Sequence, residues 1–160
     1  MNEKLLRIYL QDHHAGSTTG LELARRIRGS NKGNEYGEVM AKVVDDIAAD
    51  QKALESIMDE LGFAADKIKD LGAWALEKAG RLKLNGQITG YSPLSRVVEL
   101  EGLVTGITSK ISLWAALLQM AAEEPRLDAA RLERLRERGE SQRATIEELR
   151  ERAAREAFVG

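Results

Sequence analysis

The sequence predicts an all-α protein, a bundle of four long helices in a single domain over residues 1–160. Apolar residues recur in alternating steps of three and four along most of the chain, which is the spacing of one buried helix face. Charged residues make up 31% of the chain and aromatic residues only 4%, with two prolines, which is typical of helical proteins. No alternation of apolar and polar residues lasts long enough to indicate a strand.

Turn and capping signals divide the chain into five predicted helices. They span about residues 3–28, 35–61, 64–85, 93–122 and 126–157. Gly29 and Gly62 follow the first two helices, where a C-terminus favours glycine. Ser92 followed by Pro93 is a strong helix start, because the hydroxyl can cap the first turn and proline suits its first position. Pro125 separates the last two helices.

The lengths of the connections predict the topology. Short connections join helices 3–28 and 35–61, and helices 93–122 and 126–157, so each pair should form an antiparallel hairpin. The connection between the hairpins contains the additional helix 64–85, which at 1.5 Å per residue is about 33 Å long. We therefore expect one long crossover that makes helix 35–61 parallel to helix 93–122.

Two segments carry a family resemblance. Residues 9–16 (YLQDHHAG) and 92–101 (SPLSRVVELE) are similar to segments of bacterial ferritin-like proteins of unknown role. The expected crossover also resembles the ferritin-like fold, in which one long connection joins two helix pairs. The resemblance therefore implies a ferritin-like four-helix bundle.

The same resemblance implies a di-metal site that this chain lacks. Ferritin-like di-metal proteins carry a Glu on each of two helices and a Glu-x-x-His pair on each of the others. The two histidines here, His13 and His14, are adjacent, so no Glu-x-x-His occurs. Ferroxidase and oxygenase chemistry of the usual di-iron kind is therefore not expected.

A polar layer is nevertheless predicted in the bundle centre. Asp50 is the one polar interruption of the inner face of helix 35–61, and closing the hairpin at residues 29–34 would place His13 opposite it. The crossover topology brings Thr108 and Gln142 to about the same height. The predicted layer consists of His13, Asp50, Ser17, Thr108 and Gln142.

Two interpretations of this layer remain open. In the structural one, His13 and Asp50 form a charge-assisted hydrogen bond, because a buried carboxylate requires a partner. In the other, one divalent metal ion is held by an imidazole and two carboxylates, the ligand set of a facial triad. The candidate metal ligands are His13, His14, Asp46, Asp50 and Glu101. The structural interpretation is favoured, since polar core layers can fix helix register without a ligand, and the sequence requires no cofactor.

Composition narrows the classes of function. The absence of cysteine excludes disulfides, thiolate metal sites and cysteine nucleophiles. The net charge of −2 and the acidic residues mixed into the arginine-rich helix 126–157 predict no nucleic-acid partner. No signal peptide is evident, and the longest apolar run, residues 111–122, is too short to span a bilayer. We expect a cytoplasmic protein without a membrane partner.

These observations favour a structural or protein-interaction module over an enzyme. The candidate partners are a second copy of the chain or another protein. The alternative is a metal-binding or metal-dependent ferritin-like protein with a reduced His and carboxylate site. Two further expectations concern packing: Gly16 and Gly20 should permit close helix contact, and Phe158 should contact helix 64–85 or a second subunit.

Overall fold

A computed structural model describes residues 1–63 and 91–159, which form four helices and short turns. The helices are α1 (Glu3–Ser30), α2 (Glu35–Glu60), α4 (Pro93–Met120) and α5 (Ala129–Phe158). No strand occurs in these two ranges, so the predicted all-α, four-helix class is confirmed for them. The predicted helix 64–85 lies outside the described residues.

Each described helix begins at a polar cap. The capping side chains accept a hydrogen bond from the backbone N–H three residues on, and they are those of Asn2, Asn34, Ser92 and Asp128. Ser92 accepts from the N–H of Ser95 at 3.0 Å, and Pro93 occupies the first helical position, as predicted. These caps satisfy backbone donors that have no partner inside a helix.

The start of α5 lies three residues beyond the predicted position. The carboxylate of Glu124 accepts from the backbone N–H of Arg126 at 3.1 Å and from its Nε at 2.7 Å. This hydrogen-bonded turn holds residues 124–126 out of a helix. Asp128 then supplies the cap, and α5 begins at Ala129.

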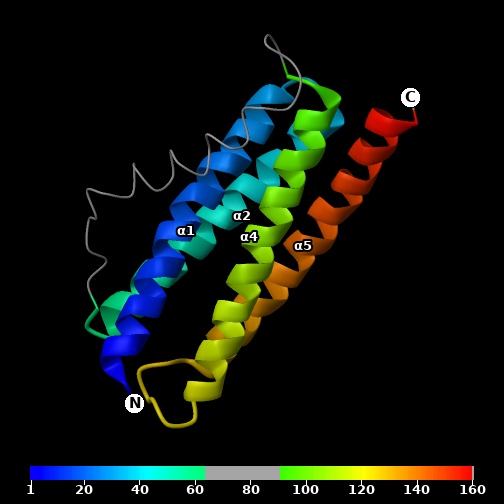
Figure 1. Ribbon diagram of the computed structural model, residues 1–160. Coiled ribbons are helices and arrows are strands. Elements are labelled where there is room, and N and C mark those ends of the chain that lie inside the picture. The colour runs from blue at the N-terminus through cyan, green and yellow to red at the C-terminus, as the bar shows by residue number, and fades with distance from the viewer. Residues whose placement is uncertain (64–90, 160) are drawn as a thin grey trace.

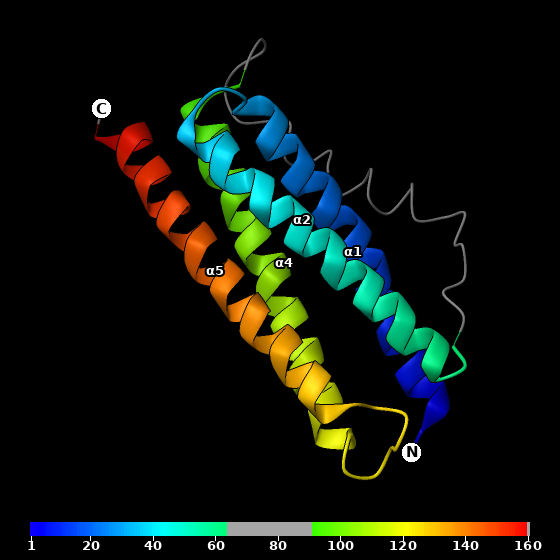
Figure 2. The ribbon, with the colours of Figure 1, turned by 180° about the vertical axis from the view of Figure 1, so that it is seen from behind.

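The helices form two antiparallel hairpins, α1 with α2 and α4 with α5 (Figure 1). Phe63, just after α2, lies under the Arg7 guanidinium near the start of α1, 5.2 Å from ring centroid to Cζ. Tyr91, just before α4, lies at the opposite end, where its hydroxyl accepts from Asn31 Nδ2 at 3.1 Å. The second hairpin therefore starts at the end of the bundle opposite to where the first finishes, and α2 runs parallel to α4 (Figures 1 and 2).

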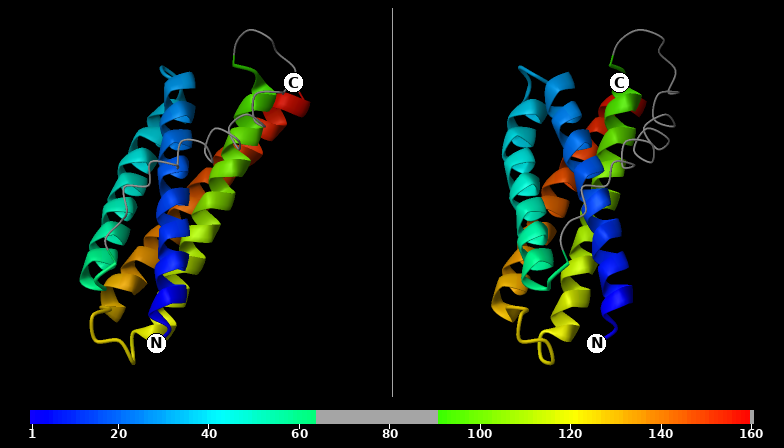
Figure 3. Two further views of the ribbon diagram at one scale, coloured as in Figure 1. Left: turned by 60° about the vertical axis from the view of Figure 1, so that its left-hand side comes forward. Right: turned by 90° about the vertical axis from the view of Figure 1, so that its left-hand side faces the viewer.

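Packing within each hairpin is closer than packing between the hairpins. α4 lies along α5 and α1 along α2, α1 also contacts α4, and α2 meets α5 only briefly. Figure 3 shows the two hairpins inclined to each other. The bundle is therefore more open between α2 and α5, and between α1 and α4, than along either hairpin.

Within residues 1–63 and 91–159, the buried apolar residues form two separate clusters. The first lies toward the α1–α2 turn and includes Ile27, Met40, Leu100 and Ile146. The second lies toward the α4–α5 turn and includes Leu10, Met58, Trp114 and Leu132. Asp50 and Gln142 are buried polar residues whose positions along α2 and α5 fall between the two clusters.

The predicted inner faces hold well for α2 and α5. The heptad spacing of helix 126–157 predicts seven inner positions, and all seven are buried in α5: Leu132, Leu135, Gly139, Gln142, Ile146, Leu149 and Ala153. α1 differs, because no residue between Leu10 and Leu21 is buried. The middle of α1, predicted to face the core, therefore stands away from it.

The C-terminal end of α5 is only partly covered. Ala153 is buried and Ala154 packs against the first cluster. Phe158 and Val159 are 67% and 80% exposed. The contact predicted for Phe158 is therefore not formed within the described residues, and its proposed partner remains a prediction.

α4 is the most apolar of the described helices. Its length and hydropathy alone would suffice to cross a membrane, and 28% of its most apolar stretch is buried in the bundle. A single helix of this kind is weak evidence for a membrane span. The expectation that the chain has no membrane partner stays a prediction.

Candidate functional site

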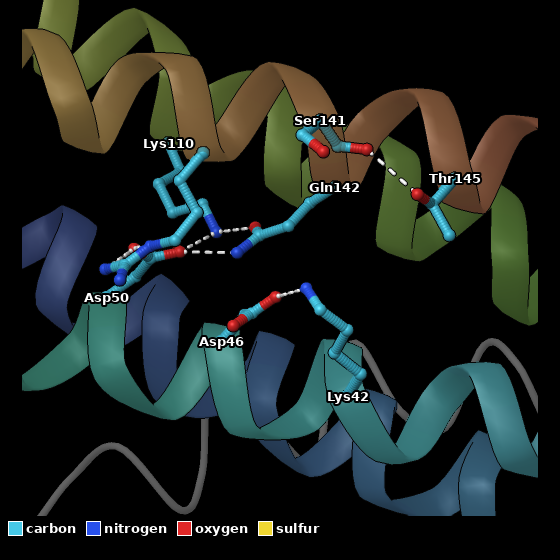
Figure 4. Close-up of polar contacts among 8 residues, drawn as sticks. Lys42, Asp46, Asp50, Lys110, Ser141, Gln142 and Thr145 are labelled. Atoms are coloured by element: carbon cyan, nitrogen blue, oxygen red, sulfur yellow. Dashed lines mark hydrogen bonds and ion pairs between the residues drawn. The ribbon is translucent and has the colours of Figure 1, made fainter.

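Asp50 is the centre of a polar layer that joins three helices (Figure 4). Its side chain is 2% exposed. Lys110 Nζ of α4 donates to Oδ2 at 2.6 Å, and Gln142 Nε2 of α5 donates to the same oxygen at 2.9 Å. Arg138 of α5 donates to Oδ1 through Nε at 2.8 Å and through a second guanidinium nitrogen. Both oxygens of this carboxylate are therefore occupied by donors of the chain itself.

Lys110 also links the amide into the layer. Its ammonium donates to Gln142 Oε1 as well as to Asp50, so the three side chains form a closed set of hydrogen bonds (Figure 4). Burial lowers the pKa of Lys110, and the carboxylate of Asp50 opposes that shift. Charge-assisted bonds in such a closed, buried set are among the stronger side-chain hydrogen bonds.

Of the residues predicted for the layer, the structure brings Asp50 and Gln142 together and gives Thr108 and Ser17 other partners. Thr108 is exposed and donates to the Val104 carbonyl at 2.8 Å. Ser17 donates to the His14 carbonyl at 2.7 Å and accepts from Gln51 Nε2 at 3.1 Å. Neither hydroxyl is hydrogen-bonded to Asp50.

The predicted bond from His13 to Asp50 is also not formed. His13 packs edge-on against Tyr9, with 4.6 Å between ring centroids, and makes no hydrogen bond to a described residue. Its pKa is lowered by burial, and the charge of Asp12 partly offsets this. The bond from Gln51 to Ser17 shows that the hairpin register sets Asp50 beside Ser17, about one turn from His13.

The candidate metal ligands are dispersed. His14 Nε2 lies 3.0 Å from Glu55, and Asp46 accepts from Lys42 at 2.8 Å. Glu101 is exposed and lies 3.7 Å from Arg150. Over residues 1–63 and 91–159, no three His, Asp or Glu side chains gather where they could hold a metal ion. The five candidates are therefore not brought together as the metal interpretation requires.

Sequence reasoning missed the two cations of the layer, Lys110 and Arg138. Both sit one position away from a predicted inner position, and their long side chains carry the charge inward. The sequence did contain a signal for Lys110, since it is the one charged residue between residues 102 and 122. A buried Asp requires a cation, and Lys110 lies at the height expected for the layer.

A cavity of about 400 Å³ lies beside this layer, between α1 and α4 with α2 behind them. Its apolar walls include Ile47, Leu54, Leu103, Ile107, Leu113 and Trp114. Its polar lining residues include Tyr9, Asp12, His13, Asp50 and Lys110. This cavity explains why the middle of α1 is not buried.

Glycines from both helices enlarge the cavity. Gly16 and Gly20 of α1 and Gly106 of α4 line it, and a Cβ at any of the three would meet no atom within 4 Å. The expectation that Gly16 and Gly20 permit close helix contact is therefore wrong. Because α1 diverges from α4 here, the missing side chains leave space instead of an interface.

A second, more polar groove of about 490 Å³ lies between α2 and α5. Lys42, Asp46, Arg138, Gln142 and Thr145 are among its lining residues, several of which appear in Figure 4. Asp46 and Lys42 pair across one helical turn, and Thr145 donates to the Ser141 carbonyl at 3.0 Å. The Asp50 layer thus separates a polar groove from an apolar cavity.

Comparisons with protein-family models, curated proteins and solved structures found no match. A proposal for the function of this protein therefore rests on its own sequence and geometry. That geometry offers a self-contained polar layer and an apolar cavity next to it.

Proposed function

We propose that this protein is a ferritin-like helical bundle that acts as a structural or protein-interaction module, with a second copy of the chain as its partner. The order and directions of the described helices support the fold assignment. α1 is flanked by α2 and α4, α5 pairs with α4, and α2 runs parallel to α4. One connection along the bundle between two hairpins is the defining feature of ferritin-like folds.

The observation that carries the structural role is the completeness of the Asp50 layer. Donors from α4 and α5 occupy both oxygens of a carboxylate on α2. A metal ion bound there would have to displace these donors. The layer ties the two hairpins together at a single height, which is how buried polar groups specify helix register.

Exposed apolar residues at one end of the bundle support a partner. Phe158 and Val159 end α5, and Leu94 is exposed at the start of α4. The two helix ends are adjacent, because Arg96 pairs with Glu156 at 3.0 Å. Exposed apolar side chains that gather in one place are typical of protein contacts.

Sedimentation velocity over a range of concentrations tests the proposal. Wild-type protein should self-associate, and Phe158→Ser with Val159→Ser should shift it to monomer. Arg155→Ser is the matched control, since Arg155 is exposed on the same helix end, and it should leave association unchanged.

Two outcomes contradict the proposal. A wild-type chain that stays monomeric at every concentration would exclude a second copy as the partner. Stoichiometric iron, manganese or zinc in elemental analysis of native, untagged protein would favour a metal-dependent function instead.

A further inference from the structure

The cavity between α1 and α4 has the properties of a small-molecule site. Its volume of about 400 Å³ lies within the usual range of about 300–1,000 Å³ for such sites. The surface of its walls is mostly apolar, and α1, α2 and α4 each also contribute polar side chains, which is the usual kind of lining of ligand pockets. The glycines leave the space open without any side chain having to move.

Lys110 supplies a donor at this cavity. Its side chain lines the cavity and is 15% exposed. Two of its three N–H groups are used by Asp50 and Gln142. The third has no acceptor among the described residues, so it is available to a molecule in the cavity.

Lys110 is the cation among the described residues that line the cavity. The layer contains one carboxylate, Asp50, and two cations, Lys110 and Arg138. Asp46, the next carboxylate along α2, is paired with Lys42. Arg138 lines the groove between α2 and α5, and Asp50 is already bound by Lys110, Arg138 and Gln142, so among the described residues Lys110 is the charged donor that a ligand in the cavity would meet. Asp12 also lines the cavity but is exposed, so water screens its charge.

We propose that the α1–α4 cavity binds an apolar molecule that carries a single carboxylate. The apolar body lies against Leu103, Ile107 and Trp114, and the carboxylate accepts the third N–H of Lys110. A neutral hydrocarbon would leave that donor without an acceptor. This binding activity goes beyond the proposed structural role and does not depend on self-association.

Isothermal titration calorimetry with octanoate tests the proposal, with 1-octanol as the uncharged ligand of equal chain length. Octanoate should bind at one per chain. Octanol should bind about tenfold more weakly, because it lacks the charge-assisted bond to Lys110. Titration with 3-phenylpropanoate separates aromatic from aliphatic acids, and tighter binding of either identifies the preferred apolar body.

Gly16→Leu tests the location of the site. A Cβ at Gly16 meets no atom within 4 Å, so the leucine side chain can enter the cavity without disturbing the helices. Octanoate affinity should fall by at least about tenfold, since the filled space excludes the ligand. Gly29→Leu is the matched control, because Gly29 lies in open space on the same helix and does not line the cavity.

Lys110→Met tests the charge. This variant should bind octanoate and octanol with similar affinity, because the donor is gone while the apolar walls remain. Circular dichroism at the titration temperature verifies that the variant is folded. Gly16→Leu keeps the layer intact and so tests the site independently.

Three results would overturn the proposal. One is the absence of binding by either acid to wild-type protein. Another is octanoate binding that survives Gly16→Leu unchanged. The last is equal affinity of the wild-type protein for octanoate and octanol, which would show that Lys110 does not recognise the carboxylate.

Discussion

The two sides of the Asp50 layer close the bundle in different ways. Between α2 and α5, Arg138 and Gln142 extend inward and satisfy the buried carboxylate. Between α1 and α4, three glycines leave open space, and His13 makes no hydrogen bond to a described residue. One gap is bridged by long polar side chains, while the other remains a cavity.

The two gaps differ in which groups must fill the space where neighbouring helices stand apart. A gap next to a buried charge has to be filled by hydrogen-bonding groups, because an unpartnered carboxylate is costly. A gap lined by apolar groups can stay open at a smaller cost, mainly lost van der Waals contact. We therefore expect the stability of the protein to be sensitive to substitution of the polar side chains between α2 and α5. We expect it to tolerate substitution at the cavity between α1 and α4.

The largest effect is expected for Asp50→Leu. This change leaves Lys110 and Arg138 without their counter-ion, and the free energy of unfolding should fall by about 3–5 kcal/mol. Urea unfolding followed by circular dichroism measures the loss. Adding Lys110→Leu to Asp50→Leu should recover part of the stability, since it removes the more buried of the two stranded cations.

Asp45→Leu is the control for that experiment. Asp45 is an exposed carboxylate on the same helix, and its replacement should change stability by less than about 0.5 kcal/mol. Equal effects of Asp50→Leu and Asp45→Leu would show that the layer does not stabilise the bundle.

Gly139, where α5 packs against α4, and Gly20, which lines the cavity, should respond to substitution with stability changes of opposite sign. At Gly139 of α5 a Cβ would lie 2.8 Å from Ile111 Cγ1, so Gly139→Ala should destabilise the protein by about 1–3 kcal/mol through overpacking. At Gly20 of α1 a Cβ meets no atom within 4 Å, so Gly20→Ala should stabilise by about 0.5–1 kcal/mol through helix propensity. Thermal unfolding of the two variants measures both. If Gly20→Ala destabilised the protein, the space between α1 and α4 at Gly20 would be smaller than the structure shows.

His13→Leu should have a smaller effect at pH 7. No hydrogen bond to Asp50 is lost, so the change in stability should be within about 0.5 kcal/mol. A loss of several kcal/mol in the free energy of unfolding would indicate that His13 does pair with Asp50.

The pH dependence of that variant supplies a second test. Burial lowers the pKa of His13 below 6.5, so the unfolded chain binds the proton more readily than the folded one. The wild-type protein should therefore lose stability as the pH falls from 6.5 through the folded pKa, and His13→Leu should not show this component. Urea unfolding between pH 7.5 and 5 would measure it, and identical pH profiles would contradict it.

The smallest effect is expected in the turn before α5. Hydrogen bonds from Arg126 lower the pKa of Glu124 to about 2, from 4.5. The turn therefore contributes stability that is present above pH 4.5 and is lost as the pH falls toward 2. Glu124→Gln should remove this component from the acid unfolding curve, and Glu123→Gln is the control on the adjacent residue. Unchanged acid curves for Glu124→Gln would contradict the prediction.

The sequence by itself determined the helices and most of their buried faces. Helix periodicity and caps are local properties that can be read over one or two turns. The heptad spacing of helix 35–61 predicts eight inner positions, and all eight are buried: Tyr36, Met40, Val43, Ile47, Asp50, Leu54, Ile57 and Leu61. The same counting, together with the hairpin order, predicted that Asp50 and Gln142 lie at about the same height, and the two side chains are hydrogen-bonded. The crossover helix and the ferritin-like assignment remain proposals that the described residues do not test.

Only the tertiary structure decided the partners of Asp50 and the position of the cavity. Lys110 and Arg138 lie beside the inner face, and their long side chains reach the carboxylate because neighbouring helices leave them room. The register of the first hairpin moved His13 about one turn from its predicted partner. Gly16 and Gly20 were expected at a close contact between helices, but in the inclined hairpins both glycines lie at open space. Register and inclination depend on the packing of whole helices, so no local pattern in the chain encodes them.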